Sequence, residues 1–329
     1  MKNKTYLITG GTGSLGKRLT LHIQNNLNPK KIKIFSRDEQ KQFNMSIDDQ
    51  FNHNKVDFYL GDIRNLSRVY EIIKDVDIVV HTAALKHVHF GEKNPEEFID
   101  TNILGTRNLI KASIDNNVEK VLFVSTDKSV YPLNLYGATK LIAEKLILNQ
   151  NLQKKKTIFS VVRYGNVAGS KGSVIPTFLK IIKNSNNYIE LRDEKITRFW
   201  ITFDEAIQCI IYSLKDMVGG EVFIPKMKSF FIKDLTQILA IKNKVKITKL
   251  KPGEKMHESL STFEDSDLIL EYKNYFKILS SYEQLNSELR KNKNAKKLSK
   301  NFCYSSDKNK NFLDKKDLNK LLNSIDIEN

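Results

Sequence analysis

Short apolar runs recur along the first half of the chain and alternate with segments whose apolar residues have helical spacing. The runs lie at residues 5–9, 31–35, 56–60, 77–81, 120–125 and 157–163. Each has the length of a buried strand, and a helical pattern of Leu19, Ile23 and Leu27 follows the first. Strands that alternate with helices build a parallel sheet with helices on both faces. The pattern therefore predicts an α/β fold with a doubly wound parallel sheet.

This alternation stops after residue 167. We expect loops and short helices over residues 168–198, then a helix that ends near Leu214 and a strand at 221–224. The two predicted domains are a larger one, made of residues 1–167 and about 200–224, and a smaller α/β one, made of residues 168–199 and 225–329 with a Lys- and Asn-rich tail. Near the C-terminal end, helical spacing predicts a docked amphipathic helix that uses Phe312, Leu313, Leu318, Leu321 and Leu322.

Composition narrows the choice of protein class. With 40% hydrophobic and 28% charged residues, the 329-residue chain is typical of a globular protein. No apolar run reaches membrane-spanning length, and the N-terminus does not read as a secretory signal. Cys209 and Cys303 are far apart and no His cluster occurs, so we expect a cytoplasmic protein without a metal site.

The net charge of +16 raises the question of nucleic acid. The lysines are scattered, however, and aromatic residues are not interleaved with them. We therefore expect a solvated basic surface and an anionic small ligand, with no nucleic-acid or membrane partner.

A glycine-rich turn joins the first strand to the first helix. Gly10, Gly13 and Gly16 follow the strand at a spacing of three. Without side chains, the backbone at such a turn can approach a pyrophosphate at the helix N-terminus, where N–H groups and the helix dipole favour anions. This placement predicts a dinucleotide-binding, Rossmann-type sheet rather than a plain turn.

The end of the second strand suggests which dinucleotide binds. An NAD site would place an acid there, whereas this chain has Ser36 and Arg37, followed by Asp38, Glu39 and Lys41. An Arg fork suits a 2′-phosphate, so we expect NADP. The alternative is only a helix start, with Ser36 as the cap and Glu39 in a capping box.

Two later strand ends supply further candidates. Asp62 could accept a hydrogen bond from adenine or simply cap the next helix. Thr82 and Ala83 are small enough for a cofactor to lie close, and Lys86 is a candidate anion contact.

The fifth strand leads into the candidate catalytic segment. Tyr136 and Lys140 are four residues apart, so on a helix they share one face. We expect the Lys140 ammonium to lower the pKa of Tyr136 and make it a base for a hydroxyl. Just upstream, Thr126, Asp127 and Lys128 offer a hydroxyl, an acid and a second base.

Several ordered motifs carry a resemblance to a known family. They are residues 9–16, 36–39, 83–88, 125–128, 134–140, 162–166, 197–202, 252–255 and 304–306. Together they resemble the inverting UDP-N-acetylglucosamine 4,6-dehydratases of pseudaminic acid biosynthesis, which are extended short-chain dehydrogenases/reductases. The resemblance implies an NADP-binding larger domain, a UDP-sugar-binding smaller domain and a homo-oligomer, either a dimer or a hexamer.

The same resemblance implies a mechanism. NADP takes a hydride from C4 of the sugar while Tyr136 takes the hydroxyl proton, and it later returns the hydride to C6. Lys128 is implied as the base at C5, and Asp127 as the acid for the C6 hydroxyl. Retaining dehydratases have Asp-Glu where this chain has Asp127-Lys128, so the pair implies the inverting reaction.

The resemblance also assigns binding residues. Those implied to contact NADP are Gly10, Thr12, Gly13, Ser14, Leu15, Gly16, Ser36, Arg37, Asp38, Glu39, Lys41, Asp62, Ile63, Thr82, Ala83, Lys86, Tyr136, Lys140 and Val167. Those implied to contact the UDP-sugar are Lys86, Asn166, Arg198, Lys251 and Glu254. The family usually has Arg where this chain has Lys251, and Pro and Ala where it has His89 and Gly91.

Two other functions remain open on the sequence. One is a retaining dehydratase or a 4-epimerase that acts on a UDP-sugar. The other is a non-catalytic NADP-binding protein whose basic surface binds RNA. Retention of both Tyr136 and Lys140 favours an enzyme.

Overall fold

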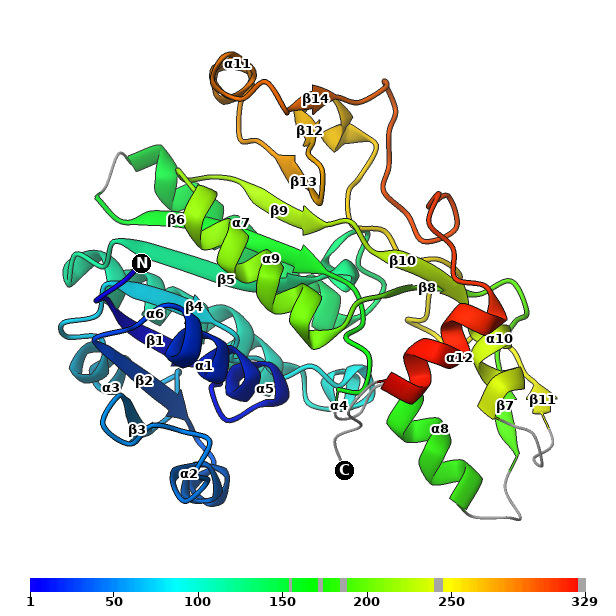
Figure 1. The fold of residues 1–329 in the computed structure, drawn as a ribbon, viewed down its shortest axis with the longest axis horizontal. Coiled ribbons are helices and arrows are strands. Elements are labelled where there is room, and N and C mark those ends of the chain that lie inside the picture. Colours follow the sequence, from blue (N-terminus) through cyan, green and yellow to red (C-terminus); the bar gives the residue numbers. More distant parts are fainter. Residues whose placement is uncertain (154–155, 171–173, 184–187, 240–244, 325–329) are drawn as a thin grey trace.

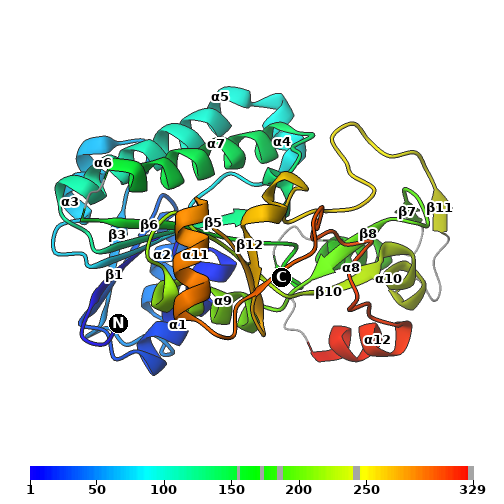
Figure 2. The ribbon, with the colours of Figure 1, turned by 90° about the horizontal axis from the view of Figure 1, so that it is seen from above.

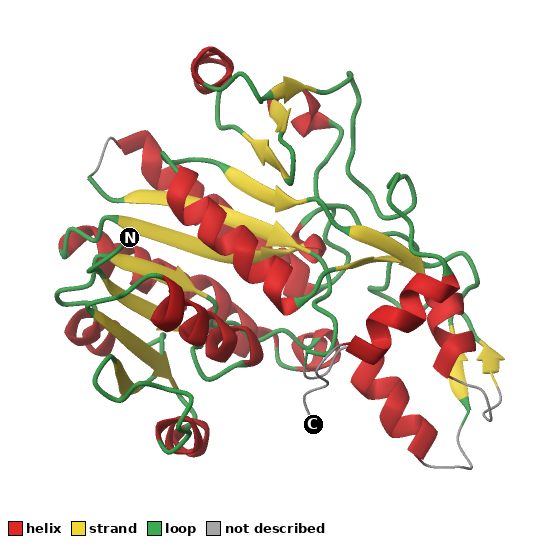
Figure 3. Cartoon of the chain, viewed as in Figure 1, coloured by secondary structure: helices red, strands yellow, loops and turns green. Residues whose placement is uncertain are grey.

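A large sheet forms the centre of the protein, whose computed structural model describes residues 1–153, 156–170, 174–183, 188–239 and 245–324 (Figures 1 and 3). In spatial order its ten described strands are β14 (Lys296–Lys297), β12 (Ile269–Glu271), β13 (Tyr275–Ile278), β9 (Val222–Pro225), β6 (Ile158–Tyr164), β5 (Lys120–Thr126), β4 (Ile78–His81), β1 (Thr5–Thr9), β2 (Lys31–Ser36) and β3 (Val56–Leu60). All neighbours from β3 to β9 are parallel. The predicted doubly wound parallel sheet is confirmed.

Helices cover both faces of this sheet, as Figure 2 shows from above. One face carries α3 (Leu66–Ile72), α6 (Gly105–Asp115) and α7 (Leu135–Asn149), and the other carries α1 (Ser14–Asn26) and α9 (Phe203–Asp216). Shorter or peripheral helices are α2 (Glu39–Ser46), α4 (Val88–Lys93), α5 (Pro95–Phe98) and α11 (Tyr282–Lys291). Because both faces are covered, central-strand residues such as Ile8, Val79 and Leu122 are fully buried.

The strand order determines where the binding crevice lies. The chain proceeds from β1 outward to β3 and then returns to β4 on the other side of β1. At such a switch point the loops after neighbouring strands diverge and leave a crevice at the carboxyl ends of the strands. Gly10 follows β1 and Thr82 follows β4, so both predicted cofactor contacts lie at this edge.

A second apolar cluster lies in a smaller lobe. The lobe contains α8 (Val174–Lys183), β7 (Ile189–Leu191), β8 (Thr197–Trp200), β10 (Lys228–Phe231), α10 (Ile232–Leu239), β11 (Val245–Ile247) and α12 (Lys315–Ser324). Trp200, Phe230 and Leu235 are buried there, and Leu318 and Leu322 of α12 pack into the same cluster (Figure 1). The predicted docked C-terminal helix is therefore confirmed for Leu318, Leu321 and Leu322, but the helix begins at Lys315, after Phe312 and Leu313.

The large sheet also takes strands from the C-terminal third. The predicted division assigns residues 225–329 to the smaller domain. In the structure β13 pairs antiparallel with β9, and β12 and β14 follow it outward. The strands within residues 269–297 therefore belong to the large sheet and not to the smaller domain. The rest of the division into two domains stays a prediction.

One helical stretch of the larger domain is interrupted. Between residues 95 and 115 it consists of α5, a π-helical segment (Ile99–Leu104) and α6. In the π segment two consecutive polar residues, Thr101 and Asn102, are buried. Asn102 binds the backbone of Leu85 through N–H and carbonyl contacts of 2.8 and 3.0 Å. Segments of this kind often occur at functional sites.

Among the described residues, no helix has both the length and the apolar character needed to cross a lipid bilayer.

Candidate active site

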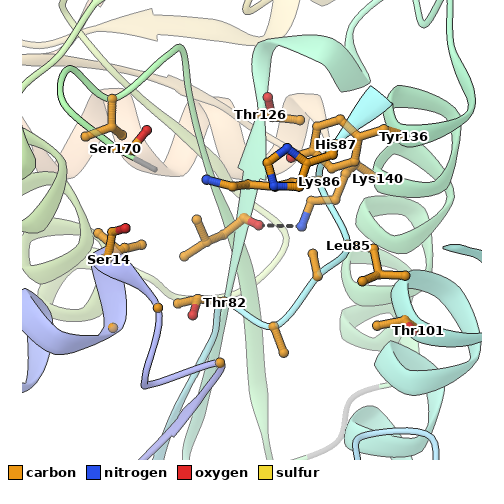
Figure 4. A pocket seen from close by; sticks show the side chains of 18 of the residues that line it. Ser14, Thr82, Leu85, Lys86, His87, Thr101, Thr126, Tyr136, Lys140 and Ser170 are labelled. Carbon is orange, nitrogen blue, oxygen red and sulfur yellow. Dashed lines mark hydrogen bonds between the residues drawn. The ribbon is translucent and has the colours of Figure 1, made fainter. Parts of the chain in front are cut away.

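A cavity of about 1020 Å³ opens at the carboxyl edge of the parallel strands. Figure 4 shows Ser14 and Thr82 toward α1, and Tyr136, Thr126 and His87 toward α7. The predicted site residues that line it are Gly10, Thr12, Gly13, Ser14, Leu15, Gly16, Ser36, Arg37, Asp38, Lys41, Ile63, Thr82, Ala83, Lys86, Thr126, Lys128, Tyr136, Lys140, Asn166 and Val167. Those that do not are Glu39, Asp62, Asp127, Arg198, Lys251 and Glu254.

The glycine-rich turn has the shape of an anion cradle. Gly10 has φ +68°, and a Cβ there would lie 2.9 Å from the backbone of Ala83. At Gly16 a Cβ would lie 2.5 Å from the backbone of Gly11. The N-terminus of α1 has neither a side-chain cap nor an acidic residue in its first turn. Its N–H groups therefore suit a pyrophosphate, and the residues present fit a dinucleotide.

The buried hydroxyl of Thr101 also fits a ligand. Thr101 lines the cavity and is 3% exposed. Its hydroxyl has no hydrogen-bond partner within the part of the chain that the structure describes. A buried polar group without a partner is costly, so a ligand in the cavity could supply the missing bond.

At the end of β2, two cations face the cavity, and the nearby carboxylate of Asp38 is already hydrogen-bonded to Lys41. Arg37 and Lys41 both line the cavity. Asp38 caps α2 by accepting from the Lys41 backbone N–H at 3.0 Å, and its carboxylate also binds the Lys41 ammonium. The alternative in which Ser36 caps this helix is wrong, because Asp38 is the cap. Asp62 pairs with Arg37 at 3.7 Å and with Arg64 at 2.7 Å.

Tyr136 and Lys140 lie at the cavity on α7, but their electrostatics differ from the expectation. Burial raises the pKa of Tyr136 to about 12, and the charge that opposes this is on Lys128, not Lys140. Lys140 donates to the carbonyl of Val124 at 2.7 Å and lies 3.8 Å from the centre of the Phe123 ring. Burial lowers the pKa of Lys140 to about 7, so its amine is partly neutral near neutral pH.

Asp127 and Lys128 form an ion pair beside Tyr136. The Lys128 ammonium donates to Asp127 at 3.0 Å and to Asn166 at 3.1 Å. Asp127 is fully buried, whereas the Lys128 side chain is 22% exposed and reaches the cavity. Burial alone would lower the pKa of Lys128, but the carboxylates of Asp127 and Glu258 raise it above its ordinary value. Lys128 is therefore an ammonium with a proton-accepting carboxylate in direct contact.

The other predicted substrate residues do not line the cavity. Arg198 donates to the carbonyls of Lys255 and Met256 at 2.9 and 3.1 Å. Lys251 and Glu254 form a turn, in which the Lys251 N–H donates to the Glu254 carboxylate at 2.9 Å.

Sequence reasoning missed the network that supports the turn over residues 126–128. Glu144, which is 1% exposed, binds the guanidinium of Arg163 at 2.5 Å. It also accepts from Ser125 and, at 2.6 Å, from Ser129. Glu144 lies four residues after Lys140 and therefore on the same helix face, which is the one available sequence signal.

Comparison with known proteins places the chain in a family. Residues 6–280 match the family described as polysaccharide biosynthesis protein. The chain belongs to that family. One relative similar to this chain is a UDP-N-acetylglucosamine 4,6-dehydratase (inverting) of Campylobacter jejuni subsp. jejuni serotype O:23/36 (strain 81-176). It is 43% identical over 327 residues, 97% of each chain, and it confirms the resemblance drawn from the motifs.

Two further comparisons bear on this polysaccharide biosynthesis protein. A UDP-glucose 4-epimerase of Rickettsia bellii (strain OSU 85-389) is 40% identical over 293 residues, 86% of this chain and 85% of the relative. The solved structure of Pen from Bacillus thuringiensis has a TM-score of 0.87 at 39% identity, and the match covers 98% and 97% of the two chains. The fold of this chain is therefore shared over nearly its full length.

The buried ion pair generates a stability prediction. Glu144→Ala leaves the Arg163 guanidinium buried without its partner, so we expect a loss of about 3–5 kcal/mol in the free energy of unfolding. The matched control is Glu71→Ala, because Glu71 is 60% exposed and pairs with Arg68 on the surface of α3. Surface pairs of this kind contribute about 0.3–0.5 kcal/mol. Urea denaturation of both variants measures the difference, and equal losses would contradict the supporting role of Glu144.

Proposed function

We propose that this protein is an NADP-dependent UDP-N-acetylglucosamine 4,6-dehydratase of the inverting type, a hydro-lyase. The observation that carries the proposal is the Asp127–Lys128 ion pair, in which Lys128 reaches the cavity beside Tyr136 and Asp127 is buried in contact with it. The relative of that name, 43% identical over 97% of both chains, supports the same reaction. The product would be UDP-2-acetamido-2,6-dideoxy-beta-L-arabino-hex-4-ulose, at the first step of pseudaminic acid-type sugar biosynthesis. We further propose that the enzyme acts in the cytoplasm as a homo-oligomer.

NADP is the proposed cofactor because of the charges at the end of β2. The glycine-rich turn and the N-terminus of α1 would hold the pyrophosphate, and Arg37 and Lys41 would hold the 2′-phosphate. Asp38 would not repel the 2′-phosphate strongly, since its carboxylate pairs with the Lys41 ammonium and caps α2 through the Lys41 N–H. Bound NADP would supply the redox chemistry, accepting a hydride from C4 and returning it at C6.

Tyr136 would take the proton of the C4 hydroxyl. Its buried phenol has a pKa of about 12, which the nearby charge of Lys128 and the contact with the Thr126 hydroxyl keep from rising further. Tyr136 would accept this proton as the phenolate, after its own proton has passed to solvent in the open cavity, a loss that the charge of Lys128 favours.

Lys128 and Asp127 would carry out the elimination as one unit. Proton transfer along their 3.0 Å hydrogen bond converts the ion pair into a neutral amine and a carboxylic acid. The amine then takes the C5 proton, which the C4 ketone acidifies, and the acid protonates the C6 hydroxyl, which leaves as water. The C5–H and C6–O bonds break, a C5=C6 double bond forms, and the ion pair is restored with the proton count it began with.

The UDP-sugar would lie between the cavity and the smaller lobe. Lys86 and Asn166 would contact it from the cavity wall, and Arg198, Lys251 and Glu254 would contact it from the lobe. Lys251 stands where the family has Arg, and an ammonium lacks the two-pronged donor geometry of a guanidinium. The affinity for the uridine diphosphate would therefore depend more on Arg198.

A second candidate function is 4-epimerisation of a UDP-sugar, which the 40% identical UDP-glucose 4-epimerase of Rickettsia bellii supports. An epimerase needs Tyr136 and the cofactor but neither a base at C5 nor an acid at C6. The presence of the Asp127–Lys128 ion pair therefore favours the dehydratase.

One experiment separates the two functions. UDP-N-acetylglucosamine is incubated with the purified protein in deuterated water, and the product is identified by NMR. The dehydratase gives a 6-deoxy-4-keto sugar with deuterium at C5 and inverted C5 configuration, and no reduced cofactor accumulates. Release of a C4 epimer without label at C5 would instead establish the epimerase.

Cofactor choice gives a second prediction. The unmutated protein should bind NADP more tightly than NAD, and Arg37→Asp should reverse the order because a carboxylate repels the 2′-phosphate. A charge-assisted hydrogen bond contributes about 1.5–3 kcal/mol, on the order of 10–100-fold in Kd. Calorimetric titration with both cofactors measures this, with Arg290→Asp on the remote helix α11 as the control. Equal Kd values in the unmutated protein would contradict the 2′-phosphate site.

A third prediction separates the two proton-transfer steps. Lys128→Met should leave NADP binding intact and still permit C4 oxidation, at a lower rate because Tyr136 loses the charge that opposes its raised pKa, but it should slow product formation by about 10²–10⁴-fold, the usual loss for one general base. Tyr136→Phe should block the first step, so that mixing with substrate gives no enzyme-bound reduced cofactor. Single-turnover absorbance and C5 deuterium exchange are measured for both, with exposed Lys291→Met as the control. Normal C5 exchange in Lys128→Met would show that another residue is the base.

A further inference from the structure

Glu258 is a buried carboxylate behind the catalytic pair, and neither the motifs nor the cavity lining draws attention to it. It is 3% exposed. Its carboxylate lies 3.7 Å from the Lys128 ammonium, 3.8 Å from Arg198 Nε and 3.6 Å from the Lys255 ammonium. One of its oxygens, Oε2, has no hydrogen-bond partner among the described residues.

The position of Glu258 is set by the backbone and by the C-terminal tail. Its N–H donates to the Ser306 hydroxyl at 2.9 Å, and its carbonyl accepts from the Ser306 N–H at 2.8 Å. The same Ser306 hydroxyl lies 2.7 Å from that of Thr197, the residue before Arg198. The carboxylate is therefore held in place without a hydrogen bond to any of the three cations, because 3.6–3.8 Å exceeds a hydrogen-bond distance.

This arrangement differs from that of the structural ion pair in the same protein. Glu144 is as deeply buried as Glu258, but it is hydrogen-bonded to Arg163 and to two serines. Burial of a charge is tolerated when such bonds satisfy it. Within the described part of the chain, Oε2 of Glu258 accepts no hydrogen bond and its three cations lie 3.6–3.8 Å away, so Glu258 acts on them through charge at a distance.

The charges around Lys128 come from several elements. Asp127 precedes it on the same turn, Arg198 comes from β8, and Glu258 and Lys255 come from the loop after β11, while the phenol of Tyr136 faces it from α7. The cluster of Asp127, Lys128, Arg198, Lys255 and Glu258 holds one more cation than anions. Without Glu258 the excess would be two, and the repulsion would favour loss of the Lys128 proton.

We propose that Glu258 is a positioning residue that keeps one shared proton on the Asp127–Lys128 pair. The inference rests on the proposed function, in which the pair needs this proton to protonate the departing C6 hydroxyl. If the pair lost it, Lys128 could still act as a base, but Asp127 could not act as an acid. In agreement with this role, Glu258 is one of the two carboxylates that raise the pKa of Lys128.

The first test does not depend on turnover. Cyanate carbamylates only neutral amines, and its rate at each lysine is followed by peptide mass spectrometry at pH 8. Removal of an opposite charge within about 4–6 Å lowers a lysine pKa by about 1–3 units. Glu258→Gln should therefore raise the carbamylation rate of Lys128 about tenfold or more, while exposed Lys2 serves as the internal reference. An unchanged rate at Lys128 in a folded Glu258→Gln protein would overturn the proposal.

The second test uses the pH dependence of kcat/KM for UDP-N-acetylglucosamine. In Glu258→Gln the shared proton is lost at lower pH, so the alkaline limb should move down by about 1 unit or more. Glu258→Asp keeps the charge but withdraws it by one methylene, so its limb should lie between those of the other two proteins. Exposed Glu283→Gln, on α11, should leave the limb unchanged. A loss of kcat with an unmoved limb would mean a merely structural role.

A misfolded variant and a failure of the proposed function can both be told apart from a failure of the Glu258 proposal. If Glu258→Gln does not fold, as judged by thermal unfolding, Glu258→Asp carries both tests through the smaller shift. If the unmutated protein does not dehydrate a UDP-sugar, the proposed function fails, but the carbamylation result still decides whether Glu258 holds the proton of Lys128.

Discussion

Glu144 and Arg163 meet in the core between α7 and β6, where their side chains are 1% and 8% exposed. Two buried charges are tolerated only when their remaining hydrogen-bonding capacity is satisfied. Glu144 meets this condition by also accepting from Ser125 and Ser129, which bracket the turn over residues 126–128. The requirement to satisfy one buried carboxylate thereby fixes the backbone that presents Thr126, Asp127 and Lys128. The same helix face carries Lys140 to the cavity, so strand, turn and helix are held as one unit.

Within this unit, two lysines have opposite electrostatic environments. Lys140 is buried against a carbonyl and an aromatic ring, and burial lowers its pKa to about 7 even though Glu144 opposes the shift. Lys128 is partly buried, but the carboxylates of Asp127 and Glu258 more than offset the effect of burial and raise its pKa. Residue type alone therefore does not determine which amine is charged. The site can offer a partly neutral amine and a firmly held ammonium at the same pH, as proton-transfer sites with divided roles require.

The features that sequence predicted are those encoded locally. Strands such as β1 follow from short apolar runs, the turn at Gly10 from its place between a strand and a helix, and the shared face of Tyr136 and Lys140 from helical periodicity. The features it missed depend on contacts between distant segments. The raised pKa of Tyr136 results from burial and is opposed by Lys128, and neither burial nor that distance can be read from a spacing of four. Glu258 is 130 positions from Lys128, so no local pattern joins them.

The chemistry of the site is divided between early and late segments of the chain. The glycine-rich turn, Tyr136 and Lys140 come from the strand–helix units of the large sheet, and they would serve any reaction that begins with oxidation at C4. Apart from Asp127, the charges around Lys128 come from later segments, since Arg198 precedes α9 and Glu258 is hydrogen-bonded to Ser306. A fold does not fix a reaction, because the reaction depends on the groups placed on it. If Glu258 acts as proposed, these late segments decide whether the pair beside Tyr136 can hold an acid and a base together, and therefore whether a C4 ketone leads on to loss of water.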